Sequence, residues 1–444
     1  KIKLKVVADE AVDMKFGTGI IKVTPAHDIT DSEIGQHHNL PSIKIINERG
    51  KMNENAGKRY EGMKVMEARE QIVKDLGELG LMEKIEAHVH NVSRCDRCNS
   101  VIEPLPSEQW FLKTSELAKL AKEEIGNEVH FHPHRWEDIA ITWLENMRDW
   151  NISRQLWWGH KIPIEGETDV LDTWFSSALW PFASLGWPDK NSADYKNYYP
   201  TDFITSDRGI IFLWQIRMIF SGKFFTGKAP FKNIYIHSTV LTKDGKRMSK
   251  SLGTGINPVE LIEKYGTDAL RFGLAYQNTG IQDIRFNEDV IMMGKKFANK
   301  FWNIARYVLT KLGNSYEIKG IRPSGSEIVS KIDSVAESVT KNIEKYKFGE
   351  AAHELYDFIW HDLADKYIEE TKDPAQSNSA DRQQRGQTLG GAGADGQETK
   401  DTLAYLLLNC LKLLHPFMPF ITEEIYSTLP IKDKKLLMIE DWPQ

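Results

Sequence analysis

The last third of the chain constrains the fold most tightly, because one periodic pattern runs through most of it. Its long segments are amphipathic at helical spacing or apolar on every side: residues 297–312, 327–346, 351–371 and 403–414. Helices of this kind gain most of their stability by burying apolar faces against one another. The sequence therefore predicts a helical bundle over residues 295–444.

One stretch inside the bundle lacks this pattern. Residues 375–400 are rich in Gln, Ser, Gly and Asp and contain almost no large apolar side chains. Such a composition cannot offset the entropy lost when the chain is ordered, so it predicts a flexible loop. Nothing in this loop suggests chemistry.

The part of the chain before the bundle mixes strands and helices. Residues 1–86 contain short β-branched runs at 20–24 and 43–46, separated by Gly-rich turns, and then a helical pattern at 66–81. This arrangement predicts a compact α+β unit. Residues 87–294 follow as a second mixed region.

Three segments of that second region have clear periodicity or boundaries. Residues 115–125 are amphipathic, and residues 210–220 form an apolar run. The segment 257–266 has a proline near its start and a glycine at its end, the asymmetry expected of a helix. The predicted fold class is therefore multidomain, with an α/β part followed by an all-α part.

The composition is that of a globular chain. Of the 444 residues, 41% are hydrophobic and 10% aromatic, which suffices for packed cores. No apolar run reaches the roughly 20 residues of a membrane span, so no membrane partner is expected. The net charge of −6 gives no general attraction to nucleic acid, so any RNA contact must use local basic patches.

The chain has three cysteines, of which only Cys95 and Cys98 lie close together. This scarcity argues against a disulfide framework and for a reducing, cytoplasmic compartment. The Cys-x-x-Cys spacing is half of a tetrahedral zinc site, and His88 and His90 are near enough in sequence to complete it. The alternative is a turn with two reduced cysteines. Because the chain begins at Lys1 without an initiator Met or a leader pattern, a fragment of a longer protein is expected.

A short cationic loop, residues 243–253, carries the sequence Arg247-Met-Ser-Lys-Ser251. Mobile cations beside small hydroxyl side chains suit a leaving pyrophosphate, whose negative charge grows as a nucleotide is cleaved. Lys250 is the first candidate for this role and Arg247 the second, with Ser249 and Ser251 beside them. The alternative is an exposed charged turn, which a basic pentamer by itself favours.

A second motif occupies residues 16–31, Phe-Gly-Thr-Gly-Ile-Ile-Lys-Val-Thr-Pro-Ala-His-Asp-Ile-Thr-Asp. It has a plain structural interpretation, since Asp28 is a good helix N-cap and Asp31 would lie in the first turn. This structural role is compatible with a functional one. Three further segments complete the set of motifs: residues 149–160, 169–177 and 414–424.

In their order along the chain, these five segments resemble those of class I aminoacyl-tRNA synthetases, above all the valine-specific members of the branched-aliphatic subgroup. The resemblance implies that residues 1–86 are the C-terminal part of an editing domain. It also implies that residues 87–294 are the later half of a Rossmann-like catalytic domain with a parallel sheet, and that residues 295–444 bind the anticodon. The implied substrates and partners are ATP with Mg²⁺, valine and tRNA(Val), and a monomer is expected.

The resemblance assigns residues to the synthetic site. Lys250, Met248 and His237 would contact ATP, and Arg247, Ser249 and Ser251 would assist Lys250 in catalysis. The amino-acid pocket would be formed by three residues: Trp174, Ile210 and Trp214. Apolar residues of this kind fill protein cores at least as often as they line ligand sites.

The resemblance also assigns an editing site. A valine pocket that selects by shape cannot strongly refuse threonine, so a second, hydrolytic site is needed. Asp28 would bind the ammonium group of the misacylated residue, while Lys22, Thr24 and Asp31 would hydrogen-bond the threonine hydroxyl that valine lacks. Phe16 belongs to the same segment. A positioned water would attack the ester, and no metal is implied.

Cations and aromatic rings alternate in the first bundle segment: Lys295, Lys296, Phe297, Lys300, Phe301, Trp302 and Arg306. Cations that meet phosphates and rings that stack on bases suit RNA binding, although most aromatic residues of a helix belong to its core. The resemblance favours tRNA contact, through Lys296, Lys300 and Trp302.

The His-Ile-Gly-His segment with which this class cradles ATP phosphates does not occur in the chain. The chain alone is therefore expected not to activate valine. By the same resemblance, cysteines preceding residue 1 would join Cys95 and Cys98 around a structural Zn²⁺. Two rival functions stay open, a free-standing aminoacyl-tRNA deacylase and a non-enzymatic tRNA-binding remnant, as does specificity for isoleucine or leucine.

Overall fold

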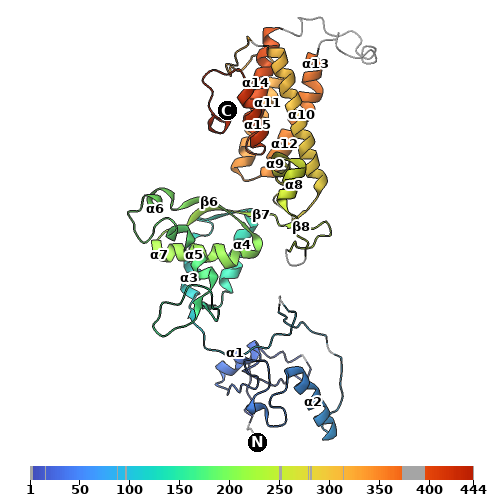
Figure 1. Ribbon diagram of the computed structural model, residues 1–444. Coiled ribbons are helices and arrows are strands. Elements are labelled where there is room, and N and C mark those ends of the chain that lie inside the picture. The colour runs from blue at the N-terminus through green and yellow to red at the C-terminus, as the bar shows by residue number, and fades with distance from the viewer. Residues whose placement is uncertain are drawn as a thin grey trace. The chain divides into compact units, whose positions relative to one another are not determined.

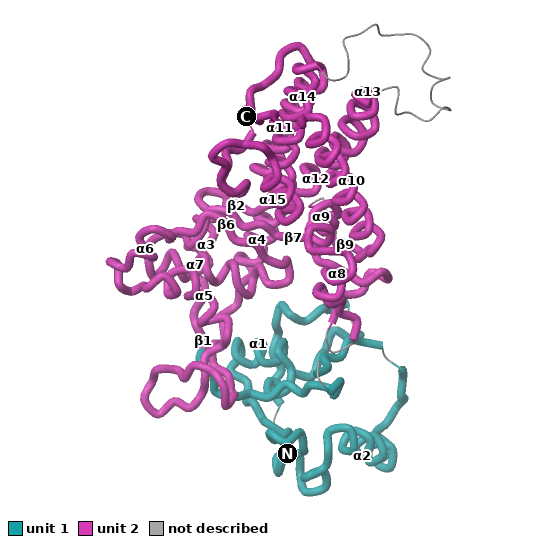
Figure 2. Tube along the Cα trace, turned by 45° about the horizontal axis from the view of Figure 1, so that its top comes forward, with its two compact units in different colours: residues 1–110 teal, residues 111–444 magenta. Residues whose placement is uncertain are grey.

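The computed structural model describes residues 4–15, 17–87, 89–95, 98–249, 253–278, 280, 283–313, 315–372 and 396–443. The chain divides into two compact units, Lys1–Trp110 and Phe111–Gln444 (Figure 2). Within these described ranges, no helix is long and apolar enough to cross a membrane.

The first unit has few regular elements. Its helical elements are α1 (Ile29–His37), η1 (Glu54–Ala56) and α2 (Val65–Glu78). Helix α2 confirms the helix predicted at residues 66–81. The β-branched runs at 20–24 and 43–46 form no strand within the described part of this unit, where only isolated bridges such as Ile46 with Met52 occur. A strand needs a neighbour along its length to pair its backbone groups, and isolated bridges do not provide one.

Close packing fixes the entrance to α1. Asp28 caps the helix, because its Oδ1 accepts a hydrogen bond from the backbone N–H of Asp31 at 3.0 Å. On the helix itself, a Cβ atom at Gly35 would lie 2.7 Å from the ring of Pro25. The loop that precedes α1 therefore lies directly against the helix, and the absence of a side chain at Gly35 permits this approach.

A parallel three-stranded sheet stands at the centre of the α/β part of the second unit. Its strands are β2 (His130–His132), β7 (Phe231–His237) and β6 (Thr201–Asp207), with β7 in the middle. Asp207 and His237 are register partners at the last positions of their strands. The carboxyl edge of such a sheet is where open α/β folds bind their ligands.

The second unit also has three two-stranded pairs: β1 (Phe111–Leu112) with β3 (Trp150–Asn151), β4 (Ser153–Arg154) with β5 (Val170–Leu171), and β8 (Val240–Leu241) with β9 (Ile284–Arg285). The first two pairs are antiparallel and the third is parallel. Strand β8 follows soon after β7 and leads into the cationic loop. The loop therefore starts from the carboxyl edge of the central sheet.

Helices pack around the sheet (Figure 1). They are α3 (Ser115–Glu124), α4 (Arg135–Glu145), α5 (Thr173–Ala183), α6 (Ala193–Tyr198), η2 (Arg208–Ile210), η3 (Ile211–Gln215) and α7 (Ile216–Thr226). The apolar run predicted at 210–220 forms η3, a single π-helical turn, and the buried first half of α7. Ile216, Met218 and Ile219 are fully buried there, which explains why the run shows no polar face.

Two helices connect the sheet to the bundle, α8 (Pro258–Tyr265) and α9 (Thr267–Gln277). Helix α8 confirms the helix predicted at residues 257–266. Asn257 caps it by accepting a hydrogen bond from the N–H of Val259 at 3.0 Å. Gly266 ends it with a φ of +94°, a backbone conformation that favours glycine.

The C-terminal part is a helical bundle, as predicted. Its elements are α10 (Glu288–Leu312), α11 (Glu327–Glu344), α12 (Phe348–Asp357), η4 (Phe358–Ile368), α13 (Glu369–Thr371), α14 (Gln397–Leu414), α15 (Pro419–Thr428) and η7 (Leu437–Ile439). Fully buried side chains such as Phe297, Phe301, Leu355 and Leu407 form its core. Each stabilises the fold by about 1.5–3 kcal/mol relative to exposure, before the entropy of ordering is counted.

Some helices begin earlier than their apolar pattern. Helix α10 starts at Glu288, because Asn287 caps it by accepting a hydrogen bond from Asp289 at 3.0 Å. Helix α14 starts at Gln397, so the last four residues of the predicted loop 375–400 form its first turn. Residues 375–395 of that loop lie outside the described residues. The fold class, α/β followed by all-α, is confirmed.

Candidate functional site

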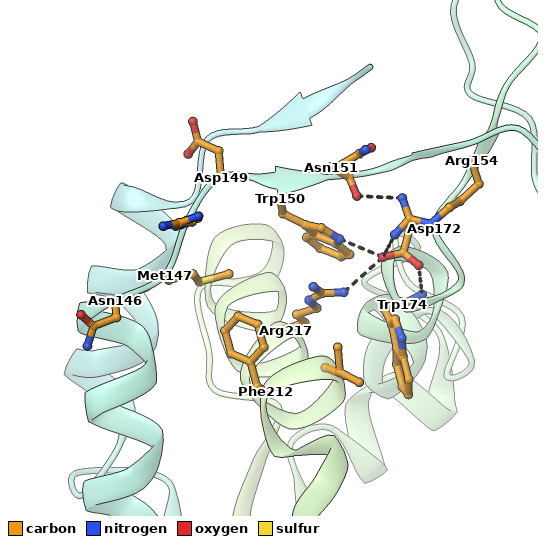
Figure 3. A pocket seen from close by; sticks show the side chains of 12 residues that line it. Asn146, Met147, Asp149, Trp150, Asn151, Arg154, Asp172, Trp174, Phe212 and Arg217 are labelled. Carbon is orange, nitrogen blue, oxygen red and sulfur yellow. Dashed lines mark hydrogen bonds and ion pairs between the residues drawn. The ribbon is translucent and has the colours of Figure 1, made fainter. Parts of the chain in front are cut away.

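A cavity of about 650 Å³ lies in the α/β part of the second unit (Figure 3). Its lining combines aromatic rings, cations and carboxylates: Trp150, Trp174 and Phe212; Arg148, Arg154 and Arg217; Asp149 and Asp172. The volume is within the range of sites for small molecules. Aromatic walls can hold the apolar side chain of a small ligand, and a few fixed polar groups can orient the charged end of the same ligand.

The buried carboxylate of Asp172 organises one wall of the cavity (Figure 3). Its Oδ2 accepts a hydrogen bond from Trp150 Nε1 at 2.8 Å, and lies 3.1 Å from Arg154 Nη2 and 3.3 Å from Arg217 Nη1. Its Oδ1 accepts a hydrogen bond from the N–H of Trp174 at 3.4 Å and so caps α5. One side chain therefore joins β3, β4, α5 and α7.

The guanidinium of Arg217 lies over the ring of Trp150, 3.6 Å from its centroid. A planar cation is well suited to this position, because it can stack on a ring and pair with a carboxylate at the same time. Burial lowers the pKa of Arg217 to about 10, while the Asp172 carboxylate acts in the opposite direction. Arg217 is therefore still a cation near neutral pH.

The predicted pocket residues lie on neighbouring elements. Trp174, in the first turn of α5, lines the cavity. Trp214 lies in η3, and its Nε1 donates a hydrogen bond to the carbonyl oxygen of Ser177 in α5 at 3.3 Å. Ile210 ends η2, next to η3, and is half-buried. Neither Trp214 nor Ile210, both in the described part of the chain, lines this cavity.

The cationic loop is anchored at the carboxyl edge of the sheet. Arg247 Nη2 lies 3.4 Å from Oδ1 of Asp207, the last residue of β6. The same carboxylate accepts hydrogen bonds from the N–H of Gly209 at 2.6 Å and from Thr239 Oγ1 at 2.7 Å. Burial acts to raise the pKa of Asp207, but these hydrogen bonds and the charges of Arg247 and His237 outweigh it and lower that pKa.

The anchor leaves no room for a side chain at position 209. A Cβ atom on Gly209 would lie 2.9 Å from Oδ1 of Asp207 and 3.1 Å from Nη2 of Arg247. Neither Asp172 nor Asp207 was predicted as a site residue from the sequence. The available signal for Asp207 was its position at the end of a strand in a parallel sheet.

The other predicted residues of the nucleotide site lie on the loop or beside it. The N–H of Ser249 donates a hydrogen bond to Thr254 Oγ1 at 2.9 Å. Met248 packs against the apolar cluster formed with α8 and α9. His237 ends β7 and is exposed, with its Nδ1 3.1 Å from the carbonyl oxygen of the next residue. Two predicted residues lie outside the described residues: Lys250 and Ser251.

Two family models match the chain. The model of tRNA synthetases class I (I, L, M and V) matches residues 44–165 and 164–287, which is more than half of the chain. The model of the anticodon-binding domain of tRNA ligase matches residues 326–444. The chain belongs to the class I tRNA synthetases.

The relatives of this synthetase chain include valine–tRNA ligases. That of Geobacillus kaustophilus (strain HTA426) is 46% identical over 471 residues, covering 100% of the chain and 52% of the relative. That of Staphylococcus aureus (strain JH9) is 43% identical over 472 residues, with the same two coverages. The chain thus spans about half the length of the curated relatives it matches.

The fold is also found in solved structures. Mycobacterium tuberculosis methionyl-tRNA synthetase in complex with methionyl-adenylate aligns with a TM-score of 0.59 and 21% identity, over 76% of this chain and 66% of that chain. A likeness at this level of identity shows that the fold is shared.

Three of the five predicted editing residues of the synthetase chain meet at the start of α1. Thr24 donates two hydrogen bonds to Asp31 Oδ2, from its backbone N–H at 2.6 Å and from its hydroxyl at 2.9 Å. Asp28 caps the helix, so the structural role predicted for it is present. Lys22 is exposed, and Phe16 lies outside the described residues.

His27, which was not predicted as a site residue, holds this segment in place. Its Nε2 accepts a hydrogen bond from the N–H of Ile45 at 3.0 Å, and its Nδ1 lies 3.2 Å from the carbonyl oxygen of Pro104. These two contacts together require the neutral ring with its proton on Nδ1. The imidazole therefore ties three segments of the first unit together.

The predicted tRNA-binding residues lie on α10 in different surroundings. Lys296 is exposed, and the ring of Trp302 is partly exposed. Lys300 pairs with Asp365 at 2.6 Å and lies 3.9 Å from the centroid of the Trp360 ring. Two rings of the same segment, Phe297 and Phe301, are fully buried in the bundle core and are not available to stack on bases.

Cys95 is half-buried and Cys98 is exposed, and both are free thiols. Hydrogen bonding to Ser100 lowers the pKa of Cys98 below its ordinary value. Among the described residues, no group of three or more His, Cys, Asp and Glu side chains is placed to hold a metal ion. His88 lies outside the described residues.

Proposed function

We propose that the complete protein to which this chain belongs ligates valine to tRNA(Val) with ATP, through a valyl-adenylate. The similarity of the whole chain to valine–tRNA ligases, at 43% and 46% identity in the two cases above, carries the proposal. The anchoring of the Arg247 loop at the carboxyl edge of the parallel sheet supports it, since adenylate chemistry needs cations at such an edge.

Adenylate formation requires in-line attack of the valine carboxylate on the α-phosphate of ATP, which enters with Mg²⁺ as part of the substrate. Negative charge then builds on the departing pyrophosphate, and positioned cations stabilise it. Lys250 and Arg247 supply this charge, and Ser249 and Ser251 supply hydrogen bonds. Met248 and His237 contact the nucleotide beside them.

The amino-acid pocket uses Trp174 and Trp214 as walls, with Ile210 beside them. Trp174 lines the cavity described above, whereas Trp214 does not line it but is tied to the same helix through Ser177. Apolar walls of this kind select by size and shape. A pocket closed by two indole rings suits a short branched side chain.

The editing site is the start of α1. Asp31 Oδ2 is occupied by Thr24, but no hydrogen bond to Asp31 Oδ1 occurs among the residues that the structure describes. That oxygen serves as the acceptor for a threonine hydroxyl, together with Lys22 and Thr24. Asp28 binds the ammonium group, and Phe16 completes the segment. Valine would leave these polar groups unpaired, so the valyl ester is not hydrolysed.

The remaining assignments complete the proposal. Residues 1–86 belong to the editing domain, residues 87–294 to the catalytic domain, and residues 295–444 to the bundle that binds tRNA through Lys296, Lys300 and Trp302. Cys95 and Cys98 contribute half of a structural Zn²⁺ site. The complete protein is cytoplasmic and monomeric.

Pyrophosphate exchange tests this function. The complete protein should exchange pyrophosphate into ATP with valine, and far less with leucine or isoleucine, whereas this chain alone should not exchange above background. In the complete protein, Lys250→Ala should slow the step by about 2–4 kcal/mol of transition-state stabilisation, with little change in valine affinity. A complete protein that showed no valine-dependent exchange would contradict the proposal.

Hydrolysis of threonyl-tRNA tests the editing site separately. Asp31→Ala should leave valylation near normal but let threonyl-tRNA accumulate, because the acceptor for the threonine hydroxyl is lost. Asp28→Ala should impair hydrolysis of every aminoacyl ester, and Asp13→Ala, a surface change in the same unit, should change nothing. If the folded Asp31 and Asp28 variants cleared threonyl-tRNA at the parental rate, residues 16–31 would only be the entrance to a helix.

A further inference from the structure

We propose that Asp172 is a positioning residue that sets the spacing of the two tryptophan walls of the amino-acid pocket, and with it the preference for valine over isoleucine. The inference rests on the proposed function, in which Trp174 and Trp214 form those walls. It assigns to Asp172 a role in specificity, exerted through other side chains, and no contact with substrate.

Two polar ties join the elements that carry the walls. The first runs from Asp172, directly before α5, to Arg217 on α7, at 3.3 Å between Oδ2 and Nη1. The second runs from Trp214 Nε1, in η3, to the carbonyl oxygen of Ser177 in α5, at 3.3 Å. Trp174 lies between Asp172 and Ser177 in sequence, so the two ties bracket it.

Asp172 is itself held from the opposite side. Trp150 Nε1 donates to it at 2.8 Å, and Arg154 Nη2 lies 3.1 Å away. The Arg217 guanidinium also lies over the Trp150 ring, 3.6 Å from its centroid (Figure 3). A buried carboxylate with this set of partners cannot shift without breaking several hydrogen bonds and ion pairs at once. The position of α7 relative to α5 is therefore fixed by the same carboxylate that holds β3 and β4.

The turn that carries Trp214 depends on these ties. The next residue, Gln215, is fully buried, yet its side-chain amide has no hydrogen-bond partner in the described part of the chain. Within that part, its amide therefore contributes no hydrogen bond that would fix the π-helical turn η3. A bulged turn of this kind can relax into a regular helix, which would rotate the residues within it. The contacts of Trp214 and Arg217 oppose that rotation.

An amide at position 172 keeps the size of this side chain but removes its charge. In Asp172→Asn a single oxygen remains, which accepts either from Trp174 or from the donors that hold Oδ2. In both orientations the NH₂ group faces N–H donors, and the ion pairs with Arg154 and Arg217 are lost. The charged tie to α7 is therefore removed either way.

The test measures kcat/KM for valine and for isoleucine in pyrophosphate exchange by the complete protein. Asp172→Asn should lower the ratio of the two values by about tenfold, within the range that one methylene group is worth in such a pocket. Most of the change should come from a higher KM for valine. Glu137→Gln is the control, since Glu137 is also buried and accepts a hydrogen bond from the N–H of Phe131, at 3.0 Å, but does not line the cavity. Its ratio should equal that of the parent.

A second variant decides the question if Asp172→Asn does not fold. Arg217→Lys keeps a cation beside Asp172 but cannot lie flat on Trp150, so the ratio should fall by a smaller factor, about threefold. A folded variant, either one, that activates valine with the parental ratio would overturn the role of Asp172. Failure of the proposed function would look different, because the unmodified complete protein would then show no valine-dependent exchange.

Discussion

Two aspartate–arginine pairs in the α/β part of the second unit differ sharply in their surroundings. Asp172 and Arg217 are buried together, with side chains that are 6% and 7% exposed. Asp207 pairs instead with an arginine, Arg247, whose side chain is 74% exposed. The first pair joins elements of the pocket wall, and the second joins the cationic loop to the sheet. The same pair of side chains is therefore buried in the cavity wall in one place and largely exposed at the cationic loop in the other.

The difference in burial determines how much each pair contributes to the stability of the fold. Removing one partner of a buried pair leaves an uncompensated charge and destabilises a protein by about 3–5 kcal/mol, whereas an exposed pair contributes about 0–1 kcal/mol. In the proposed function, an incoming phosphate would therefore have to replace an ion pair worth no more than about 1 kcal/mol to bind Arg247. A ligand of ordinary affinity could not separate Arg217 from Asp172 in this way, because breaking a buried pair requires about 3–5 kcal/mol.

The largest expected effect comes from breaking the buried pair. Arg217→Ala should lower the free energy of unfolding of the second unit by about 3 kcal/mol or more, because Asp172 loses a buried cation and Trp150 loses its stacked guanidinium. Urea unfolding followed by tryptophan fluorescence measures this change. The matched variant Arg247→Ala should change the same quantity by less than about 0.5 kcal/mol. Equal effects of the two variants would remove the distinction between the buried and the exposed pair.

A second prediction concerns a buried polar group near the same wall, the Gln215 amide, which has no hydrogen-bond partner among the residues that the structure describes. Gln215→Met should raise the free energy of unfolding by about 1–2 kcal/mol, because the desolvation of an unpaired amide is relieved in a side chain of similar volume. The control is Gln277→Met, since the Gln277 amide donates to the carbonyl oxygen of Gly273 at 3.0 Å. That variant should be neutral or destabilising. A destabilised Gln215→Met variant would mean that the amide has a partner, such as a buried water.

These contacts show where reasoning from sequence succeeds. Helix α8 was predictable because all of its signals are local: Asn257 accepts from Val259, Pro258 follows the cap, and Gly266 ends the helix. The bundle was predictable because the periodic burial of α10, from Ile291 to Leu312, repeats along one segment. In both cases, neighbouring residues carry the information.

The Asp172 cluster could not be predicted in this way. Asp172 lies 22 residues from Trp150 and 45 from Arg217 in sequence, and the motif at residues 169–177, which contains Asp172, does not indicate these partners. The pairing of Arg247 with Asp207, 40 residues apart, is equally remote. For Phe297 and Phe301, the sequence left core and RNA contact both open, and packing against the other bundle helices decided for the core.

The pH dependence of stability gives a smaller effect at the exposed pair. The pKa of Asp207 is lowered in the folded chain, so its ionised form stabilises the fold at pH values above its unfolded pKa of about 3.9. Since the hydrogen bonds to Thr239 and Gly209 add to a screened ion pair, Asp207→Asn should lose about 1 kcal/mol at pH 6–8. This difference from the parent should shrink as the pH falls below about 4, through the folded pKa. Urea unfolding at pH 7 and pH 3.5 measures it, and a difference that grew on acidification would have the wrong sign.

The smallest expected effect concerns how two lysines of the bundle, Lys296 and Lys300, contribute to tRNA binding. Lys300 already pairs with Asp365 and lies over Trp360, whereas no ion pair of Lys296 occurs among the described residues. A phosphate contact made by Lys296 releases a counterion, so Lys296→Gln in the complete protein should weaken tRNA binding about threefold and reduce the salt slope by about one. Lys300→Gln should leave the slope nearly unchanged, because its charge is largely neutralised within the bundle. Filter binding at several salt concentrations measures both slopes. If the two variants reduced the salt slope equally, the ion pair between Lys300 and Asp365 would have to open when tRNA binds. The ion pairs of the free chain would then not predict which lysines contact RNA.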